Sequence, residues 1–378
     1  MHECIENPVW PCAATGAASC LAGFEGLAVI VHGSSGCYYY PASLVHVPLF
    51  GTFITPEEVI LGTGPRLREV VRDLEGTHPH IAVINTCVPS LAGEDLRACL
   101  EGTSAIIVDS PGFMGQFEEG YQMAIEKIRP MICCHGSDIN LDGLNPVDPF
   151  NAGNCREAER LLGRIGVGIA ALISGGRFRD LKKASPYTIG INADLHSSVG
   201  EHIGSFLGID EVRKSCRAIE SLFDHVEIGA VLQEAGAAEE RIHYAADKYL
   251  KRHDPPRAAI FAGFSYGAFA AAVLTKYLDA EITCLCTRNK PSEAPYRLEQ
   301  AISLHRIREV IAGCRPDLVI GSSFERSFSG EAAFIGLTPP LRGRVRISSR
   351  PIIGIEGELS FMEDVLNACL DRERRMTN

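Results

Sequence analysis

Three features are scarce in this sequence of 378 residues: basic runs, long apolar stretches and nucleotide-binding motifs. The formal net charge is −11 at pH 7 and no five basic residues follow one another, which argues against nucleic acid as a partner because duplex binding depends on clustered Lys and Arg. No eighteen apolar residues occur in succession, and the N-terminus lacks a charged segment followed by an apolar region and a cleavage site. We therefore expect a cytoplasmic protein without a membrane partner.

None of the lysines follows a glycine, so the sequence has no G-x-x-x-x-G-K-[ST] loop. We accordingly expect no bound nucleotide on this chain. Gly166 and Gly168 form only the start of a dinucleotide fingerprint, and there is no C-x-x-C pair or H-E-x-x-H motif. Any electrons that the protein uses must therefore come from a partner.

Fourteen cysteines are many for a cytosolic protein, and the chain is too long for a small disulfide-stapled scaffold. Most lie inside apolar segments, where cysteine usually behaves as a small buried hydrophobe. Cys133 and Cys134 are neighbours on a predicted strand and would point to opposite faces, so they cannot easily enter one site. Three others lie where a loop meets a regular element: Cys12, Cys37 and Cys87.

Cys12 precedes a run of small residues at 13–18 that predicts the first turns of a helix, where the helix dipole favours a thiolate. Cys37 follows an apolar strand and a glycine-rich turn, and Cys87 follows the predicted strand at 81–86. The carboxyl ends of parallel strands meet at one edge of an open sheet, where ligands bind. The three thiols can therefore converge, which indicates iron–sulfur chemistry.

Apolar strand segments alternate with helical periodicity, which predicts an α/β fold with parallel sheets. Strands are expected at 27–32, 81–86, 104–108, 131–134, 167–173, 188–192, 258–262, 281–286 and 317–321. Helices are expected at 66–74, 94–101, 117–128, 154–164, 199–207, 235–250, 268–278, 298–312 and 361–371. The pattern repeats three times, which predicts units at 1–135, 136–208 and 209–378, the last with a helical connection and a C-terminal helix.

Small or polar residues follow several predicted strands, at 174–176, 193–198, 263–267 and 321–323. If the three units face one another, these loops surround a common ligand cavity. Each loop taken alone is explained equally well by a tight turn that caps the next helix.

Four segments resemble the N-terminal signature of nitrogenase component 1 subunits, most closely the β-type subunit: 11–26 (PCAATGAASCLAGFEG), 31–37 (VHGSSGC), 85–87 (NTC) and 93–96 (GEDL). The superfamily also includes the catalytic parts of protochlorophyllide and chlorophyllide reductases. A weaker similarity continues at 145–154 and 317–322. The resemblance implies three Rossmann-like domains around a central cavity, with a cluster at a subunit interface.

The same resemblance, carried over residue by residue, implies Cys12, Cys37 and Cys87 as cluster ligands. It places four neighbours beside the cluster: His32, Gly33, Gly36 and Thr86. A 4Fe-4S cluster takes four protein ligands, so the fourth is expected across the interface of a homodimer. Six cysteines near a two-fold axis would also suffice for a larger, 8Fe nitrogenase-type cluster, and this alternative stays open.

The chain is shorter than nitrogenase subunits and has no convincing equivalent of the cysteine and histidine that hold the iron–molybdenum cofactor; Cys216 and His225 lie in a helical stretch. It most resembles the nitrogenase-like reductases of methanogenic archaea that act on nickel-sirohydrochlorin a,c-diamide in coenzyme F(430) biosynthesis. That resemblance implies electrons from a separate homodimeric P-loop ATPase with its own 4Fe-4S cluster. It also implies a six-electron ring reduction of the nickel tetrapyrrole with lactam closure, to the seco-F(430) precursor.

Such a substrate carries several carboxylates, so we predict Arg177 and His196 as substrate contacts. His32 and His196 are weak candidates for proton transfer, although a fixed hydrogen bond for His32 and a surface or capping role for His196 are simpler interpretations. Three alternatives remain: a nitrogenase-like reductase of a chlorin or a small sulfur compound, a non-catalytic scaffold for cluster assembly, and a zinc- or sugar-binding α/β protein.

Overall fold

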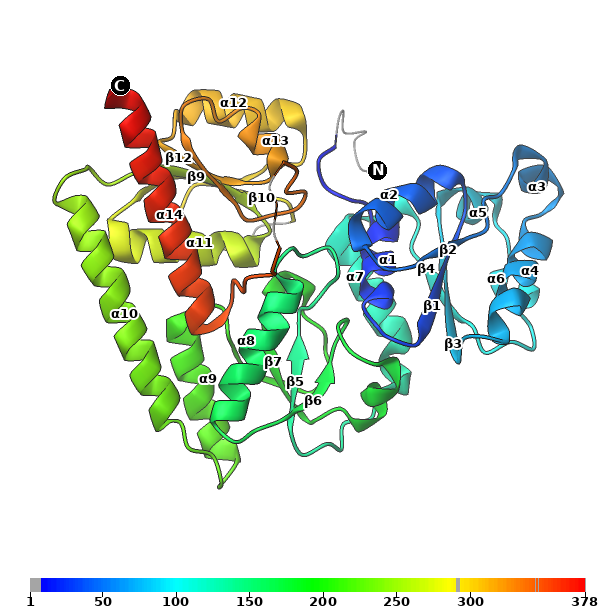
Figure 1. The fold of residues 1–378 in the computed structure, drawn as a ribbon. Coiled ribbons are helices and arrows are strands. Elements are labelled where there is room, and N and C mark those ends of the chain that lie inside the picture. Colours follow the sequence, from blue (N-terminus) through cyan, green and yellow to red (C-terminus); the bar gives the residue numbers. More distant parts are fainter. Residues whose placement is uncertain (1–7, 290–292, 344, 346, 378) are drawn as a thin grey trace.

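Three parallel β-sheets, each flanked by helices, follow one another along the chain. The computed structural model describes residues 8–289, 293–343, 345 and 347–377. Figure 1 shows the first sheet in blue and cyan, the second in green and the third in yellow to orange, each in a separate unit. The predicted α/β class with parallel sheets is confirmed, and the strands of the three sheets span 27–109, 139–205 and 257–336.

The first sheet has the strand order β2-β1-β3-β4 and buries its two central strands. Its strands are β1 (Leu27–His32), β2 (Phe50–Gly51), β3 (His80–Asn85) and β4 (Ile106–Asp109). The helices of this unit are α1 (Ala13–Ala22), α2 (Ser35–Val45), α3 (Pro56–Leu61), α4 (Gly64–Glu75), α5 (Cys87–Ala92), α6 (Leu96–Cys99) and α7 (Phe117–Ile128). Because β1 and β3 are adjacent and parallel, with His32 opposite Asn85, the segments that follow them begin at the same edge.

The second sheet has the order β6-β5-β7-β8, and the third has the order β11-β10-β9-β12-β13. The second unit comprises β5 (Ile139–Asp142), α8 (Asn151–Arg164), β6 (Ile169–Leu172), β7 (Tyr187–Gly190), β8 (Glu201–Ser205) and α9 (Ile209–Leu222). The third sheet comprises β9 (Arg257–Ala262), β10 (Glu281–Thr287), β11 (Leu298–Gln300), β12 (Leu318–Gly321) and β13 (Ala333–Gly336). Its helices are α11 (Phe264–Leu278), α12 (Leu304–Cys314) and α13 (Ser323–Arg326).

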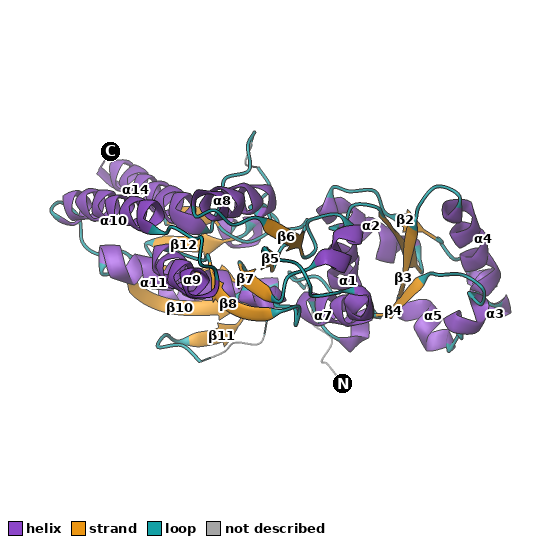
Figure 2. Cartoon of the chain, turned by 90° about the horizontal axis from the view of Figure 1, so that it is seen from below, coloured by secondary structure: helices purple, strands orange, loops and turns teal. Residues whose placement is uncertain are grey.

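Two long helices, α10 (Gly229–Leu250) and α14 (Gly354–Thr377), tie the second and third units together. The C-terminal helix α14 packs on α8, α9 and α10, as Figures 1 and 2 show. The segment that leads into α14 is held by the side chain of Asn154, whose Oδ1 accepts the N–H of Ile352 at 2.9 Å. None of the described helices, these two included, combines the length and apolar composition that crossing a membrane requires.

Glycines bring α1 and α7 into close contact and thereby fix the start of α1. A Cβ on Gly16 would lie 1.8 Å from the carbonyl oxygen of Phe117, and one on Gly120 would lie 1.8 Å from that of Ala13. The N–H of Ala13 also donates to the carbonyl of Gly115 at 3.0 Å. Side chains larger than glycine would push the helices apart, so this contact sets the position of Cys12 directly before α1.

Three predicted elements are wrong in whole or in part. The expected helix at 298–312 begins only at Leu304, because residues 298–300 form the edge strand β11. The expected strand at 131–134 is replaced by a 3-10 turn, η2 (Arg129–Met131), and one isolated bridge from Cys134 to Ala184, while the sheet begins only at β5. The expected helix at 199–207 is instead the edge strand β8, which pairs in parallel with β7. Pairing with a neighbouring strand outweighs local periodicity there, and Gly200 adopts a φ of +68° that breaks a helix.

Candidate metal centre

The three cysteines singled out from the sequence all lie at helix N-termini in the first unit. Cys12 is the N-cap residue of α1, Cys37 lies in the first turn of α2, and Cys87 opens α5. Cys37 and Cys87 follow the adjacent strands β1 and β3. Helix N-termini present free N–H groups and a partial positive charge, which favour anionic ligands such as thiolates.

The sulfurs of Cys12 and Cys87 meet at Gly112. The Gly112 N–H donates to the Sγ of Cys87 at 3.1 Å. A Cβ built on Gly112 would lie 3.2 Å from the Sγ of Cys12 and 3.3 Å from the Sγ of Cys87. Gly112 begins the 3-10 turn η1 (Gly112–Met114) after β4, so a third strand end of the sheet supplies the glycine that leaves room beside both thiols.

Cys37 lies in the first turn of the neighbouring helix α2, which packs against α1. The Ser34 hydroxyl donates to the Sγ of Cys37 at 3.7 Å. The pKa of Tyr40, one turn further along α2, is raised first by burial and then by the negative charge of Cys12, while Arg342 opposes the shift. The ring of Tyr40 therefore lies within electrostatic reach of Cys12, at the helix that carries Cys37.

The sulfurs of Cys12, Cys37 and Cys87 do not all lie within 4.8 Å of one another, as the ligands of a single ion would. Four thiolates around one tetrahedral Zn²⁺ lie about 3.8 Å apart, because each Zn–S bond is about 2.3 Å. Among the described residues, one group of three metal-ligating side chains has all its ligand atoms within 4.8 Å of one another. That group is Asp142, His196 and His202, and it includes none of the cysteines. A cluster in which each iron binds its own thiolate needs the wider spacing.

The predicted neighbours of the cluster hold the two strand ends together. A Cβ on Gly33 would lie 1.9 Å from the Oγ1 of Thr86, and the Thr86 hydroxyl donates to the carbonyl of His32 at 2.8 Å. Gly33 is thus required for this close approach, whereas Gly36 faces open space. The structure places all four predicted neighbours, His32 included, at this edge, and their role beside a cluster stays a prediction.

His32 is fully buried and its ring is fixed by two hydroxyl groups. Its Nδ1 lies 3.1 Å from the Oγ1 of Thr52 and its Nε2 lies 2.9 Å from the Oγ1 of Thr63. Burial lowers the pKa of His32 to about 4, and the charge of Glu94 opposes this shift. The ring is therefore neutral near pH 7 and positions two loops, which fits the fixed hydrogen-bonding role better than proton transfer.

Large apolar side chains are exposed around the thiols. They belong to the helix and turn segments that carry or follow the cysteines: Tyr39, Tyr40, Phe53, Leu91, Phe113 and Met114. We call this set the apolar rim. Cys12 is itself exposed, and Cys37 and Cys87 are half-buried. Exposed apolar patches of this kind are typical of surfaces that bind another protein or a ligand.

A cavity of ≈ 50 Å³ lies where the three units meet. It is lined by the N-terminal segment, α7, the loops after β5 and β7, the start of α11 and residues 337–339. Ligand pockets usually hold about 300–1,000 Å³, so this space is too small for a tetrapyrrole. Its described lining contains no Lys, Arg or His, so the cationic lining expected of a carboxylate-rich substrate is absent from these residues.

Buried acids dominate this cavity. Burial raises the pKa of Glu118 to about 8, a shift that the hydrogen bond from Trp10 opposes and the negative charge of Asp194 reinforces. Trp10 Nε1 donates to the Oε2 of Glu118 at 3.0 Å. Burial also raises the pKa of Asp194, while hydrogen bonds from Asn289 and Ser265 oppose it. Glu118 is largely protonated at neutral pH and can release a proton into the cavity.

Two of the four predicted ligand loops contribute to this cavity and two do not; of these two, the loop 174–176 lines the pocket beside Arg177 instead. Residues from 193–198 and 263–267 line it. We expected no G-x-S-x-G motif, and this was wrong, because residues 263–267 have that spacing. The Ser265 hydroxyl accepts the N–H of Ala193 at 3.1 Å and its own N–H donates to Asp194. The loop 321–323 serves as a helix cap, because the Ser322 hydroxyl accepts the N–H of Phe324 at 3.1 Å.

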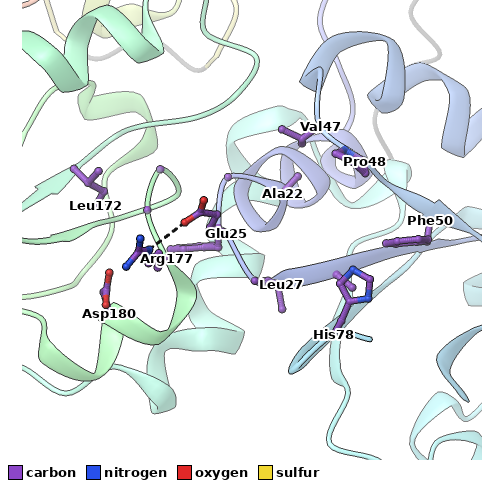
Figure 3. A pocket seen from close by; sticks show the side chains of 16 residues that line it. Ala22, Glu25, Leu27, Val47, Pro48, Phe50, His78, Leu172, Arg177 and Asp180 are labelled. Atoms are coloured by element: carbon purple, nitrogen blue, oxygen red, sulfur yellow. Dashed lines mark hydrogen bonds and ion pairs between the residues drawn. The ribbon is translucent and has the colours of Figure 1, made fainter. Parts of the chain in front are cut away.

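Arg177 lies away from the cysteines, beside the start of β1. Figure 3 shows it in a pocket of ≈ 660 Å³ with Glu25, Asp180 and His78, and its Nε donates to the Oε2 of Glu25 at 3.3 Å. The pocket includes Leu27, the first residue of β1, whereas the thiols lie at the strand's other end. The structure therefore does not bring Arg177 and the cysteines together, and a substrate contact for Arg177 stays a prediction.

His196 lies beside the second sheet, next to His202 and Asp142. The two imidazole rings have centroids 3.8 Å apart. The pKa of His196 is lowered by burial and then by His202, while Asp142 opposes the shift. His202 and Asp142 were not among the residues predicted for a site, because Asp142 ends a segment that mixes polar and apolar residues before Gly143 and so gives no clear strand signal. A substrate role for His196 stays a prediction.

Comparison with known proteins completes this description. The sequence matches the family described as nitrogenase component 1 type oxidoreductase over residues 12–370. It is similar to the nitrogenase iron-molybdenum cofactor biosynthesis protein NifE of Clostridium pasteurianum, with 25% identity over 279 residues, 65% of this chain and 60% of that protein. It is also similar to the nitrogenase molybdenum-iron protein beta chain of Azotobacter vinelandii, with 27% identity over 190 residues, 44% of this chain and 36% of that protein.

The chain thus spans about 60% of the length of that NifE and less of the beta chain. Among solved structures, nitrogenase Cp1 at pH 6.5 superposes with a TM-score of 0.83 over 99% of this chain and 95% of that chain, at 17% sequence identity. Similarity at this level of identity concerns the fold, which agrees with the three parallel sheets described above.

Proposed function

Because this chain belongs to the nitrogenase component 1 type oxidoreductase family, we propose that it is the catalytic component of a nitrogenase-like reductase. In this proposal it forms a homodimer that holds a 4Fe-4S cluster through Cys12, Cys37 and Cys87. The substrate is nickel-sirohydrochlorin a,c-diamide, which is reduced and closed to the seco-F(430) precursor. The electrons come from a separate homodimeric P-loop ATPase that carries its own 4Fe-4S cluster.

The convergence of Cys12 and Cys87 at Gly112, on a surface surrounded by the apolar rim, carries the proposal. Thiols at an exposed edge can share a cluster with a second subunit, which a buried site could not. Three ligands from one chain leave a four-iron cluster one ligand short. A fourth ligand from the partner would complete the set, and an 8Fe cluster between six cysteines remains the alternative.

The chain's own groups prepare this site for an anionic cluster. The Gly112 N–H points at the Sγ of Cys87, and such N–H···S contacts tune the potential of iron–sulfur sites. Cys12 and Cys87 stand at helix N-termini, whose partial positive charge stabilises thiolates. When bound, the cluster supplies one-electron transfer at the dimer interface.

Glu118 can supply a proton to the cavity between the units, because it keeps its proton up to about pH 8. The Trp10 indole N–H holds its carboxyl group in place. The cavity is too small for the tetrapyrrole as it stands, so in this proposal the ring lies at the apolar rim, on the interface side. Arg177 and His196 are the predicted contacts of the substrate carboxylates. They could contact the substrate only if it also binds at a second position.

The nickel tetrapyrrole is favoured over dinitrogen because, in the part of the chain that the structure describes, the connecting helices α9 and α10 offer no cysteine suited to hold an iron–molybdenum cofactor. Cys216, the only cysteine of the connecting helices α9 and α10, is buried in the core of α9, and burial raises its pKa to about 11. A thiol that resists ionisation in an apolar core is a poor metal ligand.

A second candidate function is a scaffold on which a cluster is assembled and passed on. Two relatives support it: the NifE of Clostridium pasteurianum and the NifN of Rhodobacter capsulatus, which is 26% identical to this chain over 185 residues, are both nitrogenase iron-molybdenum cofactor biosynthesis proteins. A scaffold predicts release of the cluster to an apo-acceptor and no ATP-dependent reduction of a substrate. The reductase predicts the opposite on both counts.

The first experiment tests the ligands. The chain is purified anaerobically as wild type and as the Cys12→Ala, Cys37→Ala and Cys87→Ala variants, with Cys133→Ala as a control because Cys133 is also exposed but lies elsewhere. Iron content and the visible charge-transfer band should fall strongly in the three ligand variants and stay unchanged in the control. Full retention of iron in any of the three removes that residue from the ligand set.

The second experiment tests the substrate. The wild-type protein is incubated anaerobically with the P-loop 4Fe-4S ATPase of the same organism, a reductant, MgATP and nickel-sirohydrochlorin a,c-diamide. ATP-dependent loss of the substrate spectrum supports the proposal. No change with the nickel compound, together with turnover of a chlorin or a small sulfur compound, moves the assignment to another substrate; cluster transfer without any turnover moves it to the scaffold.

A further inference from the structure

A second group of metal-ligating side chains lies outside the cysteine site, at the edge of the second sheet. Asp142 ends β5, His202 lies on β8, and His196 lies on the loop between β7 and β8. One ligand atom from each lies within 4.8 Å of the others. Asp142 is the last residue of β5, whereas His202 is the second residue of β8 and lies opposite Thr188 of β7, and 60 positions separate Asp142 from His202 in the sequence.

The carboxylate of Asp142 is oriented in advance. It is buried, with 1% of its side chain exposed, and its Oδ1 accepts the N–H of Gly143 at 2.8 Å. Its Oδ2 accepts the N–H of Ser197 at 2.6 Å and lies 3.2 Å from the Nε2 of His202. Backbone donors that fix a carboxylate in this way are typical of the groups that orient metal ligands.

The distances fit a small transition-metal ion. Two ligand atoms that are each about 2.0–2.1 Å from a tetrahedral ion lie about 3.3 Å apart, which is close to the 3.2 Å between Asp142 Oδ2 and His202 Nε2. His196 is exposed and its ring lies 3.8 Å from that of His202, centroid to centroid. An exposed ring can rotate to complete the site without disturbing the core.

We propose that Asp142, His196 and His202 bind one divalent transition-metal ion of the Zn²⁺ or Fe²⁺ class, with at least one coordination position open to solvent. Two imidazoles and one carboxylate are the ligand set of open, three-ligand sites for these ions. Binding through Nε2 of His202 replaces its contact with the Ser197 carbonyl, 3.0 Å away, and the neutral ring then carries its proton on Nδ1. The site is separate from the thiols and does not rest on the proposed function.

The ion would also connect two units of the molecule. The side chain of Gln122 on α7 donates to the backbone carbonyl of His196 at 2.5 Å. The loop that carries His196 therefore already rests on the first unit. A metal ion that ties this loop to Asp142 and His202 would fix it to the second sheet as well, so metal binding should raise the melting temperature of the whole chain.

Zn²⁺ titration of the full-length chain against a chromophoric chelator tests the site. Wild type should bind one more Zn²⁺ per chain than His196→Gln, or bind that equivalent about 100-fold more tightly or better. Zinc bound by the cysteines is common to both proteins and cancels in the comparison. His305→Gln is the matched control, because His305 is exposed on α12 and pairs with Glu309 at 3.2 Å; it should bind as wild type does.

A second variant gives a spectroscopic signature. His196→Cys should keep the site and add a thiolate ligand, so Co²⁺ binding should give extra near-ultraviolet charge-transfer absorption relative to wild type. Equal Zn²⁺ stoichiometry and affinity for wild type and His196→Gln, with no added Co²⁺ band in His196→Cys, would overturn the proposal and leave His202 and Asp142 as an ion pair. Because His196 is exposed, neither variant depends on a change in the core.

Discussion

At the scale of single residues, Gly112 contacts two of the three thiols, yet the sequence did not mark it as part of the cysteine site. It supplies an N–H to Cys87 and leaves the space beside two sulfurs. Nothing in the sequence around it marks this role, because the strand that precedes it is short and the two thiols it contacts lie far away in the chain. The contact exists only once the ends of β3 and β4 meet the start of α1.

Gly112→Ala should therefore lower cluster content without unfolding the chain. The added methyl group would lie 3.2–3.3 Å from the sulfurs of Cys12 and Cys87, which forces one or both thiols to move. We expect iron per chain after anaerobic purification to fall by half or more. The control is Gly236→Ala on α10, where a Cβ meets nothing within 4 Å; an equal iron content in both variants would contradict the role assigned to Gly112.

Glu118 predicts a pH dependence of stability. Its pKa is about 8 in the folded chain and about 4.5 in an unfolded one, so between these values the unfolded state loses a proton that the folded state keeps. The contribution of neutral Glu118 is complete below the unfolded pKa and is lost as the pH rises towards 8, by on the order of 1 kcal/mol per pH unit.

Glu118→Gln removes this dependence while keeping an acceptor for Trp10. We expect the melting temperature of the variant to change less between pH 5 and pH 8 than that of wild type, with the largest gain near pH 8. Glu126→Gln is the control, because Glu126 is exposed on the same helix, α7. Parallel pH profiles for wild type and Glu118→Gln would show that the carboxyl group is not held neutral.

At the scale of elements, the sequence predicted the helices and strands in which buried residues recur with a regular period. The helix at 117–128 has the predicted bounds, and the strand at 27–32 agrees as well. The failures are short edge segments such as β2 and β8, which gain their hydrogen bonds from a neighbouring strand rather than from their own composition. β5 was missed for another reason: its residues 139–142 mix polar and apolar side chains, and all four are buried.

The loop after β10 contains a buried charge whose partner lies on another element. Arg288 and Glu325 form a fully buried ion pair between this loop and α13. Glu325 also accepts hydrogen bonds from the N–H and the hydroxyl of Ser322, both at 2.7 Å. The loop at 321–323, whose composition allowed either a ligand loop or a helix cap, is thus engaged in holding α13.

Arg288→Met should destabilise the chain by about 3–5 kcal/mol, because it leaves the carboxylate of Glu325 buried without its counter-charge. The double variant Arg288→Met/Glu325→Gln should recover a large part of this loss, since it removes the uncompensated charge. Chemical denaturation followed by circular dichroism measures both. A single variant within 1 kcal/mol of wild type, or a double variant less stable than the single one, would contradict this account.

At the scale of the whole molecule, the sequence predicted three α/β units and the edge at which the cysteines lie, because alternation of strands and helices survives in the local pattern. It could not predict how tightly the units close around their common cavity. That depends on side chains from all three units, such as Trp10, Asp148 and Tyr266, which meet only in the folded chain. Because this cavity is too small for a large substrate, we expect such a substrate to bind at the surface.

Whether the apolar rim is covered in a homodimer decides whether two chains can share a cluster there. Leu91 lies on α5, four residues after Cys87, and its side chain is 75% exposed. A homodimer that shares a cluster should bury this side chain, and a charge there would be left without water or partner, at a cost of several kcal/mol. Leu91→Glu should therefore shift the protein from dimer to monomer and lower its iron content together.

Tyr244 provides the matched comparison, since it is also 75% exposed but lies on α10, away from the thiols. Tyr244→Glu should remain dimeric and keep its iron, measured by sedimentation or light scattering beside iron analysis. A monomeric Leu91→Glu that keeps full iron would show that one chain completes the ligand set by itself. A dimeric Leu91→Glu would place the subunit interface elsewhere, and the shared cluster would then lose its structural basis, because both predictions rest on the same exposed edge of the first sheet.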